Sequence, residues 1–592
     1  MEKKQSIWRM LLWQSGYFDT PEFDSHRRFI FWMFALGLTY LSRIMANPIT
    51  ALVDSEEIFR LIVDGLRILC VVIVLADIIL HVLLHKFRLV HRIVKAVIIA
   101  AGIIMTAADL FMLWYWHRPF DTKILDIVLS ARVNESFEFF RTYITDGGFI
   151  LFIIGTVAAI LIMYRLRKAV LLFTAIMIVT AFQEVIMFPA IFNAFYLTPR
   201  NANYLSIYRM ASMIQTVRAE RLEYRAILDG KPKEITLTRN DSSIPYTVFI
   251  LGEATARNHM SLYGYHLPTT PRLDRRKQEG GLHVFTDVIA PHSYTVIVLE
   301  KLFNFYRYGG TGKWFTYTNI FSILKAAGVH TAWLSNQERN TFYYPGTLYS
   351  NACDFVAYVD TRYDWYFVRS YDGELLPLLD DVIEKSAEKN FCVLHLIGTH
   401  SDYSKRYPPE YAKFTASDMT GGWDGITDRQ QQIRAEYDNA MLYNDFIVDE
   451  IIRRFEDKNA VVIYLSDHGQ EVFDEYNFMS HGGEEPYRNI IEIPFVIWTS
   501  LKFRQAYPEL EARIAASVNR PYMTDDMIHT LLDLMGIETA EYDPAKSVIN
   551  PNFDSSRQRI YAGMLYDKDK GLHHVPGIHF ANDANPGGMV IE

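Results

Sequence analysis

Residues that could bind a metal recur between positions 253 and 481 of this 592-residue chain, several of them directly after apolar runs. In chain order they are Glu253, His400, Asp467, His468 and His481. Carboxylate oxygens and imidazole nitrogens are the ligands that a divalent metal such as zinc takes when thiolates are lacking. These residue types therefore predict a metal centre, provided that the fold brings them together.

A hydroxyl nucleophile is also present. Thr295, in Pro-His-Ser-Tyr-Thr, precedes the apolar helical run Val-Ile-Val-Leu-Glu-Lys-Leu. Taken alone, a threonine there is typical of an ordinary helix cap. The start of a helix also offers free amides and a positive dipole, which suit a phosphorylated hydroxyl. A metal would lower the pKa of that hydroxyl enough for attack. We expect Thr295 to be the nucleophile, with Ser293 as the alternative.

The elements that must position these residues form an alternating pattern, which predicts an α/β domain over 245–592. The expected strands are 246–251, 330–334, 391–397, 460–465 and 494–498. The expected helices are 295–304, 318–327, 373–387, 431–455 and 522–536. Apolar strands that alternate with helices indicate a largely parallel sheet covered on both faces. Ligands bind beyond the carboxyl ends of such strands, so Glu253, His400 and Asp467–His468 would meet at one edge, with Gly469 permitting a tight turn.

The first third of the chain is different, and residues 1–192 are predicted to form a membrane domain. Its five apolar stretches are 29–46, 68–85, 96–116, 149–164 and 169–190. About 17–25 such residues cross a bilayer as a helix. The loops after the second and fourth stretches carry lysine and arginine without acids, so they are predicted to be cytoplasmic. The amino terminus is then also cytoplasmic, and everything after residue 192 lies outside.

Other features of this part have a predicted role. The external loop 117–148 has the pattern of an amphipathic helix that could lie on the outer leaflet. Residues 193–244 are predicted to be a bridge, with a helix over 204–229. Three acids fall within the predicted spans, where carboxylates are either functional or protonated and bonded between helices: Asp77, Asp109 and Glu184.

Composition excludes several classes. The net charge of −9, from 59 basic and 68 acidic residues, is spread along the chain, which argues against a nucleic-acid-binding protein. Three cysteines cannot supply a disulfide framework. Cys353 and Cys392 are the one plausible pair, and two free thiols are the favoured interpretation.

The motifs in combination resemble a known family. They are Gly-Glu-Ala-Thr at 252–255, Thr295 before a helix, Gly-Thr-His at 398–400 and Ser-Asp-His-Gly at 466–469, all after a five-span amino-terminal part. Together they resemble the membrane phosphoethanolamine transferases. These are bacterial inner-membrane enzymes with a periplasmic, sulfatase-like head of the alkaline phosphatase superfamily. Further support comes from Ser-Leu-Tyr-Gly-Tyr (261–265) and from the segment 437–445. The resemblance covers nearly the whole chain.

The resemblance implies a site and a reaction. Glu253, Thr295, Asp467 and His468 would bind one zinc ion tightly, and Thr295 would be the nucleophile. His400 and His481 match the histidines that the family places around the phosphate or a second metal. Thr295 would take phosphoethanolamine from phosphatidylethanolamine and pass it to lipid A, a lipopolysaccharide core sugar or another surface glycan. Glu135 resembles a family glutamate near the lipid-entry region.

The chain departs from the lipid A-modifying branch in ways that favour the branch that modifies lipopolysaccharide core sugars. No cysteine lies near Thr295, and the lysine often found in the phosphate site has no match, which leaves Arg339 as a cationic substitute. Arg132 stands where an asparagine often precedes the loop glutamate.

Three rival functions share parts of this pattern. A sulfatase would need a Cys or Ser in a C/S-x-P-x-R setting, which the sequence lacks. A glycerol-phosphate transferase of the lipoteichoic acid synthase type shares the five spans and the threonine. A membrane sensor could bind metal or phosphate in its head without turnover.

Overall fold

The computed structural model describes most of the C-terminal half and parts of the N-terminal third. The described residues are 25–36, 55–116, 120, 122, 124–125, 128, 147–165, 172–178, 206–230, 234–337, 344–359, 370–481, 487–561, 564–568 and 571–573. The chain divides into two compact units, Met1–Glu220 and Arg221–Glu592. We call them the N-terminal unit and the C-terminal unit. The predicted sites Glu135, Arg339 and Glu184 lie outside the described residues.

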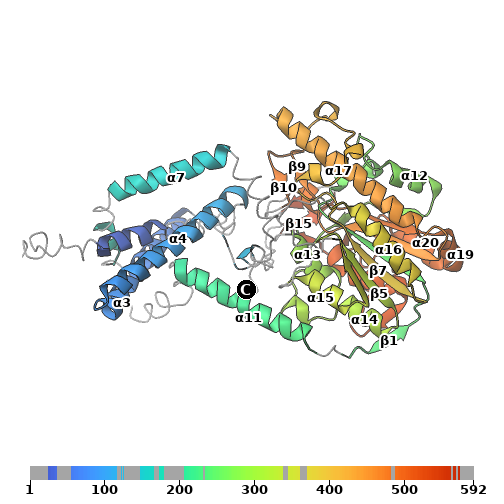
Figure 1. Ribbon diagram of the computed structural model, residues 1–592, viewed down its shortest axis with the longest axis horizontal. Helices are drawn as coiled ribbons and strands as arrows, with labels where there is room; N and C mark the ends of the chain where they lie inside the picture. The colour runs from blue at the N-terminus through green and yellow to red at the C-terminus, as the bar shows by residue number, and fades with distance from the viewer. Residues whose placement is uncertain are drawn as a thin grey trace, which may run out of the picture. The chain divides into compact units, whose positions relative to one another are not determined.

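The C-terminal unit contains a seven-stranded sheet in the order β3-β11-β8-β2-β7-β5-β6; β7 and β5 of this sheet are labelled in Figure 1. In that order the strands span Leu282–Phe285, Phe495–Thr499, Ala460–Ser466, Tyr246–Gly252, Asn390–His395, His330–Ser335 and Phe355–Tyr358. The strands β8, β2, β7, β5 and β6 are parallel, whereas β11 pairs antiparallel with both β8 and β3. The sheet is therefore largely parallel, with one reversed strand near its edge.

Both faces of the sheet are covered by helices, because the strands are apolar on both sides. Phe249 and Leu251 of β2 belong to one hydrophobic core, while Val248 and Ile250 of the same strand belong to another. The first core is closed by α13 (Thr295–Leu302), α14 (Ile320–Ala326), α15 (Pro345–Ala352), α19 (Leu501–Ala506), α20 (Pro508–Ser517) and α21 (Met527–Met535). The second is closed by α12 (Pro271–Glu279), α16 (Leu375–Glu384) and α17 (Asp428–Arg453) (Figure 1).

The sequence predicted the five main strands and placed its five predicted helices close to α13, α14, α16, α17 and α21, but it missed α12, α15, α19 and α20. It missed the edge strands β3 and β6 and did not foresee that β11 runs antiparallel. The predicted helix 522–536 begins too early, because Tyr522–Met523 is the short strand β12 and Thr524–Asp526 is a 3-10 turn before α21.

In the N-terminal unit, two described helices hold segments long and apolar enough to cross a membrane. Leu66–Leu84 lies within α3 (Ser55–Leu84), and Arg88–Met112 lies within α4 (Arg88–Trp116). A shorter apolar segment, Ile150–Ile162, lies in α7 (Gly147–Arg165). Of the first and fifth predicted spans the structure describes only parts, which are helical at 25–36 and 172–178.

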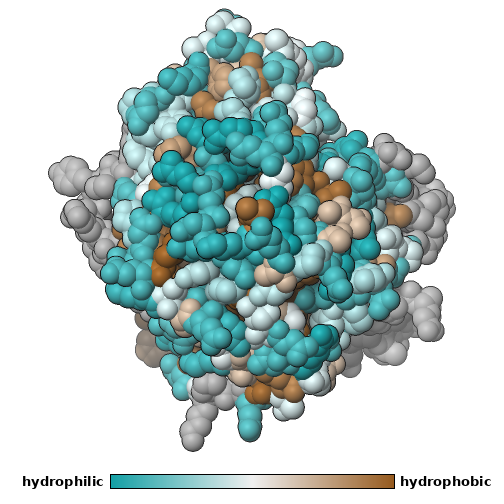
Figure 2. Space-filling model, turned by 90° about the vertical axis from the view of Figure 1, so that its right-hand side faces the viewer, coloured by the Kyte–Doolittle hydropathy of each residue, from teal (hydrophilic) through white to brown (hydrophobic). Residues whose placement is uncertain are grey.

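The surfaces of the two units differ in kind. Large apolar side chains such as Ile79, Leu83, Ile104 and Leu151 are exposed on α3, α4 and α7. The face of the C-terminal unit seen in Figure 2 is mostly hydrophilic, with small separate hydrophobic areas. An apolar helix surface is what lipid tails require, whereas the C-terminal unit has a surface suited to water.

The predicted bridge helix and free cysteines are both observed. The helix α11 runs from Ser206 to Leu228 and buries Met213, Val217 and Tyr224. Cys353 and Cys392 are free thiols. The boundary between the two units falls inside α11, while the predicted domain limits at 192 and 244 remain predictions.

Candidate metal and nucleophile site

Two neighbouring strands bring the first metal-ligand candidates together. In the parallel pair β2–β8, Gly252 lies opposite Ser466, so the next residues, Glu253 and Asp467, leave the sheet side by side. His468 comes directly after Asp467. One ligand atom from each of Glu253, Asp467 and His468 lies within 4.8 Å of the other two, and all three residues are fully buried or nearly so. The expectation that these strand ends converge is met.

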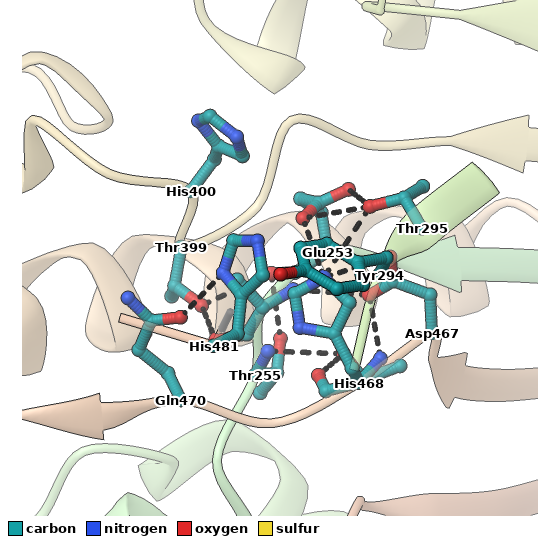
Figure 3. A network of polar contacts seen from close by, with 12 residues as sticks. Glu253, Thr255, Tyr294, Thr295, Thr399, His400, Asp467, His468, Gln470 and His481 are labelled. Carbon is teal, nitrogen blue, oxygen red and sulfur yellow. Dashed lines mark hydrogen bonds and ion pairs between the residues drawn. The ribbon is translucent and has the colours of Figure 1, made fainter. Parts of the chain in front are cut away.

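Thr295 completes this cluster from the first turn of α13 (Figure 3). Its hydroxyl oxygen lies 3.2 Å from Glu253 Oε2 and 3.3 Å from His468 Nε2. The residue before the helix is Tyr294, and no side chain caps the helix. The Thr295 hydroxyl therefore points to the charged cluster and does not serve as a cap. Thr295 is also partly accessible, whereas the alternative nucleophile Ser293 is fully buried.

The backbone around the cluster is unusually constrained. Ala254, next to Glu253, has a positive φ of 54°. A side chain at Gly469 would bring its Cβ to 2.0 Å from the carbonyl oxygen of Asn489. Glycine is therefore required here by close backbone approach, since Gly469 is not among the positive-φ residues. Backbone strain of this kind is common where a fold over-determines a functional site.

Burial and mutual charge interactions shift the pKa values of all three residues of the cluster. Burial raises the pKa of Asp467 to about 7, and the nearby Glu253 carboxylate adds to the effect. Burial also opposes the charged form of His468, but Asp467 and Glu253 outweigh it and raise the pKa of His468 to about 9. Burial likewise opposes ionisation of Glu253, yet His468, His400 and His481 keep the pKa of Glu253 well below its ordinary value.

The residues fit a divalent cation. Asp467 Oδ1 accepts hydrogen bonds from the amides of Ala254 and His468, but Oδ2 has no hydrogen-bond partner among the described residues. The Nδ1 atom of His468 is 2.8 Å from the carbonyl oxygen of Gly469, so Nδ1 donates and Nε2 is the nitrogen that a cation would take in place of a proton. A buried carboxylate oxygen without a hydrogen bond, 3.3 Å from an oriented imidazole nitrogen, suits a metal site.

The other two predicted histidines lie nearby in different settings. The ring of His481 is 4.0 Å from that of His468, and its Nδ1 donates to Gln470 Oε1 at 2.9 Å. Burial, with His468 adding to it, lowers the pKa of His481, so this ring is neutral. His400 stands apart from the cluster, with its ring 6.3 Å from that of His481 (Figure 3).

Sequence reasoning missed one residue of the site. The Gln337 amide donates to Glu253 Oε2 and to the carbonyl of Leu396, each at 2.9 Å. Gln337 lies two positions after the end of β5. Glu253 and Asp467 were predicted because each lies just beyond the carboxyl end of a parallel strand, and the same rule would have identified Gln337.

Comparisons with known proteins agree with this geometry. Residues 245–537 match the sulfatase family. The chain is 30% identical to phosphoethanolamine transferase CptA of Salmonella typhimurium over 518 residues, which cover 81% of this chain and 85% of CptA.

Two solved structures are similar. One is the zinc complex of the C-terminal periplasmic domain of EptC from Escherichia coli, with 31% identity and a TM-score of 0.52, covering 58% of this chain and 96% of that domain. The other is the integral membrane protein lipooligosaccharide phosphoethanolamine transferase A (EptA) from Neisseria meningitidis. Its TM-score is 0.56 at 20% identity, over 88% of this chain and 97% of EptA, which shows that the fold is shared.

Proposed function

This chain belongs to the phosphoethanolamine transferase family, and on that premise we propose that it transfers phosphoethanolamine from phosphatidylethanolamine to lipopolysaccharide through a phospho-threonine at Thr295. The acceptor is a hydroxyl or phosphate of lipid A, of a core sugar or of another surface glycan.

One observation carries the proposal. The Thr295 hydroxyl lies 3.2–3.3 Å from both Glu253 and His468, in the cluster with Asp467, whose Oδ2 has no hydrogen bond among the described residues and lies 3.3 Å from His468 Nε2. A partly accessible hydroxyl in contact with buried carboxylate and imidazole ligands is the arrangement that metal-assisted phosphoryl transfer needs. A non-catalytic sensor would have no use for a hydroxyl directed at the metal ligands.

Glu253, Asp467, His468 and Thr295 would hold a zinc ion, as the zinc complex of the EptC domain supports. When bound, zinc lowers the pKa of the Thr295 hydroxyl and offsets charge on the phosphoryl oxygens. Gln337 fixes one carboxylate oxygen of Glu253, and the Gly469 carbonyl fixes the tautomer of His468. The chain itself therefore orients the two side chains.

In the first step, Thr295 Oγ attacks the phosphorus of the donor. The new Oγ–P bond replaces the P–O bond to diacylglycerol, and the proton lost by Thr295 balances the one gained by the leaving oxygen. His481 is suited to handle that proton, because its Nδ1 is bonded to Gln470 and its Nε2 carries the lone pair. In the second step an acceptor oxygen attacks the same phosphorus, the Oγ–P bond breaks, and the proton that the acceptor loses restores the Thr295 hydroxyl.

The membrane anchor suits a lipid donor. A catalytic unit tethered at the bilayer reaches a head group without drawing acyl chains into water. The basic loops favour an amino terminus in the cytoplasm and a C-terminal unit in the periplasm of a bacterial inner membrane. Glu135 in loop 117–148 and Arg339 remain the predicted contacts to the donor lipid and its phosphate.

The test is a transfer assay with the full-length protein in detergent or vesicles. The protein is given phosphatidylethanolamine labelled in its head group, together with lipid A or core oligosaccharide, and the acceptors are analysed by mass spectrometry. We expect a phosphoethanolamine increment on one acceptor. Transfer of phosphoglycerol from phosphatidylglycerol, with no transfer of phosphoethanolamine, would favour the glycerol-phosphate transferase instead.

A further inference from the structure

The N-terminal unit gathers three histidines from three helices, and none of them has a role in the proposed reaction. His26 lies on the helix at 25–36, His81 near the end of α3, and His91 near the start of α4. The ring centres of His26 and His81 are 5.0 Å apart, and each lies 6.1 Å from the ring centre of His91. Each ring is thus a neighbour of both others.

A buried ion pair orients one of these rings. The Nδ1 atom of His26 is 2.5 Å from Asp77 Oδ2, and Asp77 Oδ1 is 2.7 Å from Lys95 Nζ. Asp77 and Lys95 are both buried. A carboxylate that bonds one imidazole nitrogen fixes the ring and directs the other nitrogen to a metal. For His26 that second nitrogen is Nε2.

The other two rings each have a buried nitrogen without a hydrogen bond. Neither His81 Nδ1 nor His91 Nε2 has a partner among the described residues. Buried polar atoms are nearly always paired, so two such atoms on adjacent rings need an explanation. His81 and His91 thus each have one nitrogen available for a ligand, and Nε2 is the His26 nitrogen that Asp77 does not engage.

We infer that His26, His81 and His91 form a second metal site, one that takes a divalent transition-metal ion such as zinc. At a zinc–nitrogen distance of about 2.0–2.1 Å and a tetrahedral angle, the ring centres of two ligating imidazoles lie about 5 Å apart. The His26–His81 separation of 5.0 Å matches this value, whereas the two 6.1 Å separations to His91 exceed it by about 1 Å. Imidazole ligands favour zinc, copper or nickel over magnesium or calcium.

Metal binding would draw these rings together. Among the described residues, only Glu253, Asp467 and His468 have ligand atoms that all lie within 4.8 Å of one another. The three histidines are therefore in an open arrangement, and the rings must turn inward to bind an ion. Because the rings come from three helices, the bound ion would join those helices near one end of α3 and α4.

The test counts zinc in the full-length protein, purified in detergent, loaded with zinc and desalted. Elemental analysis should give two zinc ions per chain in the wild type and one in the Asp467→Ala/His468→Ala variant. Adding His81→Ala and His91→Ala to that variant should remove the remaining ion. Adding His85→Ala should leave it, because His85 is exposed and its Nδ1 lies 3.2 Å from the carbonyl oxygens of His81 and Val82.

Zinc content that does not change when His81 and His91 are replaced would overturn the inference. X-ray absorption on the zinc-loaded Asp467→Ala/His468→Ala variant needs no change to the cluster and so avoids any folding defect there. It should show three imidazole nitrogens, and a shell of oxygens alone would also overturn the inference. Equal zinc in the wild type and in this variant would instead count against the catalytic zinc.

Discussion

The C-terminal unit contains two buried groups of carboxylates and imidazoles with opposite character. In one group, His259 bridges Asp438 and Asp474 through its two ring nitrogens, at 2.6 and 2.9 Å. Tyr265 donates to the second oxygen of Asp438, and Arg434 pairs with Asp474. Every carboxylate oxygen of this group has a partner, and two cations face two anions.

The other group, Glu253, Asp467 and His468, is incomplete. The polar contacts within this group, and those to Thr295, are 3.2–3.5 Å long. Asp467 Oδ2 has no hydrogen-bond partner among the described residues. Residue types alone do not separate the two groups, since both pair Asp with His. The difference lies in whether the protein supplies all the partners, and a buried group that lacks them is suited to a cation.

Replacement of the nucleophile should give the largest effect. We expect Thr295→Ala to lower transferase activity at least about a thousand-fold, because the covalent route is lost. Zinc content should stay largely intact, since three ligands remain. The control is Ser293→Ala, which should change activity little. If Thr295→Ala retains activity and Ser293→Ala does not, the nucleophile is Ser293.

Matched aspartate substitutions should separate the two groups. Asp467→Asn should lower the zinc content of the C-terminal unit strongly, because it weakens a charged ligand. Asp438→Asn should leave zinc content unchanged but cost about 3–5 kcal/mol of unfolding free energy, because it breaks a buried charge pair. Elemental analysis and denaturant unfolding measure the two quantities. Loss of zinc in both variants, or in neither, would contradict the distinction.

The group of His259, Asp438 and Asp474 should also make the free energy of unfolding depend on pH. Burial opposes the charge of His259, but Asp474 and Asp438 outweigh it and raise its pKa to about 10. The native state therefore keeps a proton that the unfolded chain loses near pH 6.5. This stabilisation is complete below about pH 6.5 and is lost as the pH rises through about 10, at up to about 1.4 kcal/mol per pH unit.

Unfolding free energies measured from pH 6 to pH 10 test this expectation. Wild type should lose stability across that range, and His259→Gln should show a shallower slope. Equal slopes would mean that His259 is not charged in the native state.

The smallest effect is expected from Gln337. Gln337→Ala removes a hydrogen bond that orients Glu253 but removes no ligand, so zinc affinity should fall about 10–100-fold while saturating zinc restores much of the activity. Gln337→Asn, with a shorter side chain, should behave in the same way. Unchanged zinc affinity in a chelator competition assay would show that Glu253 is positioned without Gln337.

The metal cluster could be predicted from the sequence because parallel strands place their carboxyl ends at one edge. Glu253 and Asp467 each come after an apolar run, and the β2–β8 register places them side by side. Strand direction was harder to foresee. The run at 494–498 is as apolar as its neighbours, so nothing in it indicated that β11 is antiparallel.

Long-range pairing could not be predicted either. His259 and Asp438 are 179 positions apart, and neither residue type nor spacing connects them. Gln337 lies in the stretch 335–341, where the expectation of a cation favoured Arg339, although its place just after β5 could have identified it. For His259 and Asp438 the deciding fact is a hydrogen bond between distant segments, which residue type alone does not reveal.

The most direct test of the central claim is the mass of the Thr295 peptide after incubation of the full-length protein with phosphatidylethanolamine and no acceptor. We predict a phosphoethanolamine increment on Thr295 that disappears when lipopolysaccharide is added. An unmodified peptide in a protein that still transfers phosphoethanolamine, or an increment on another residue, would contradict the claim.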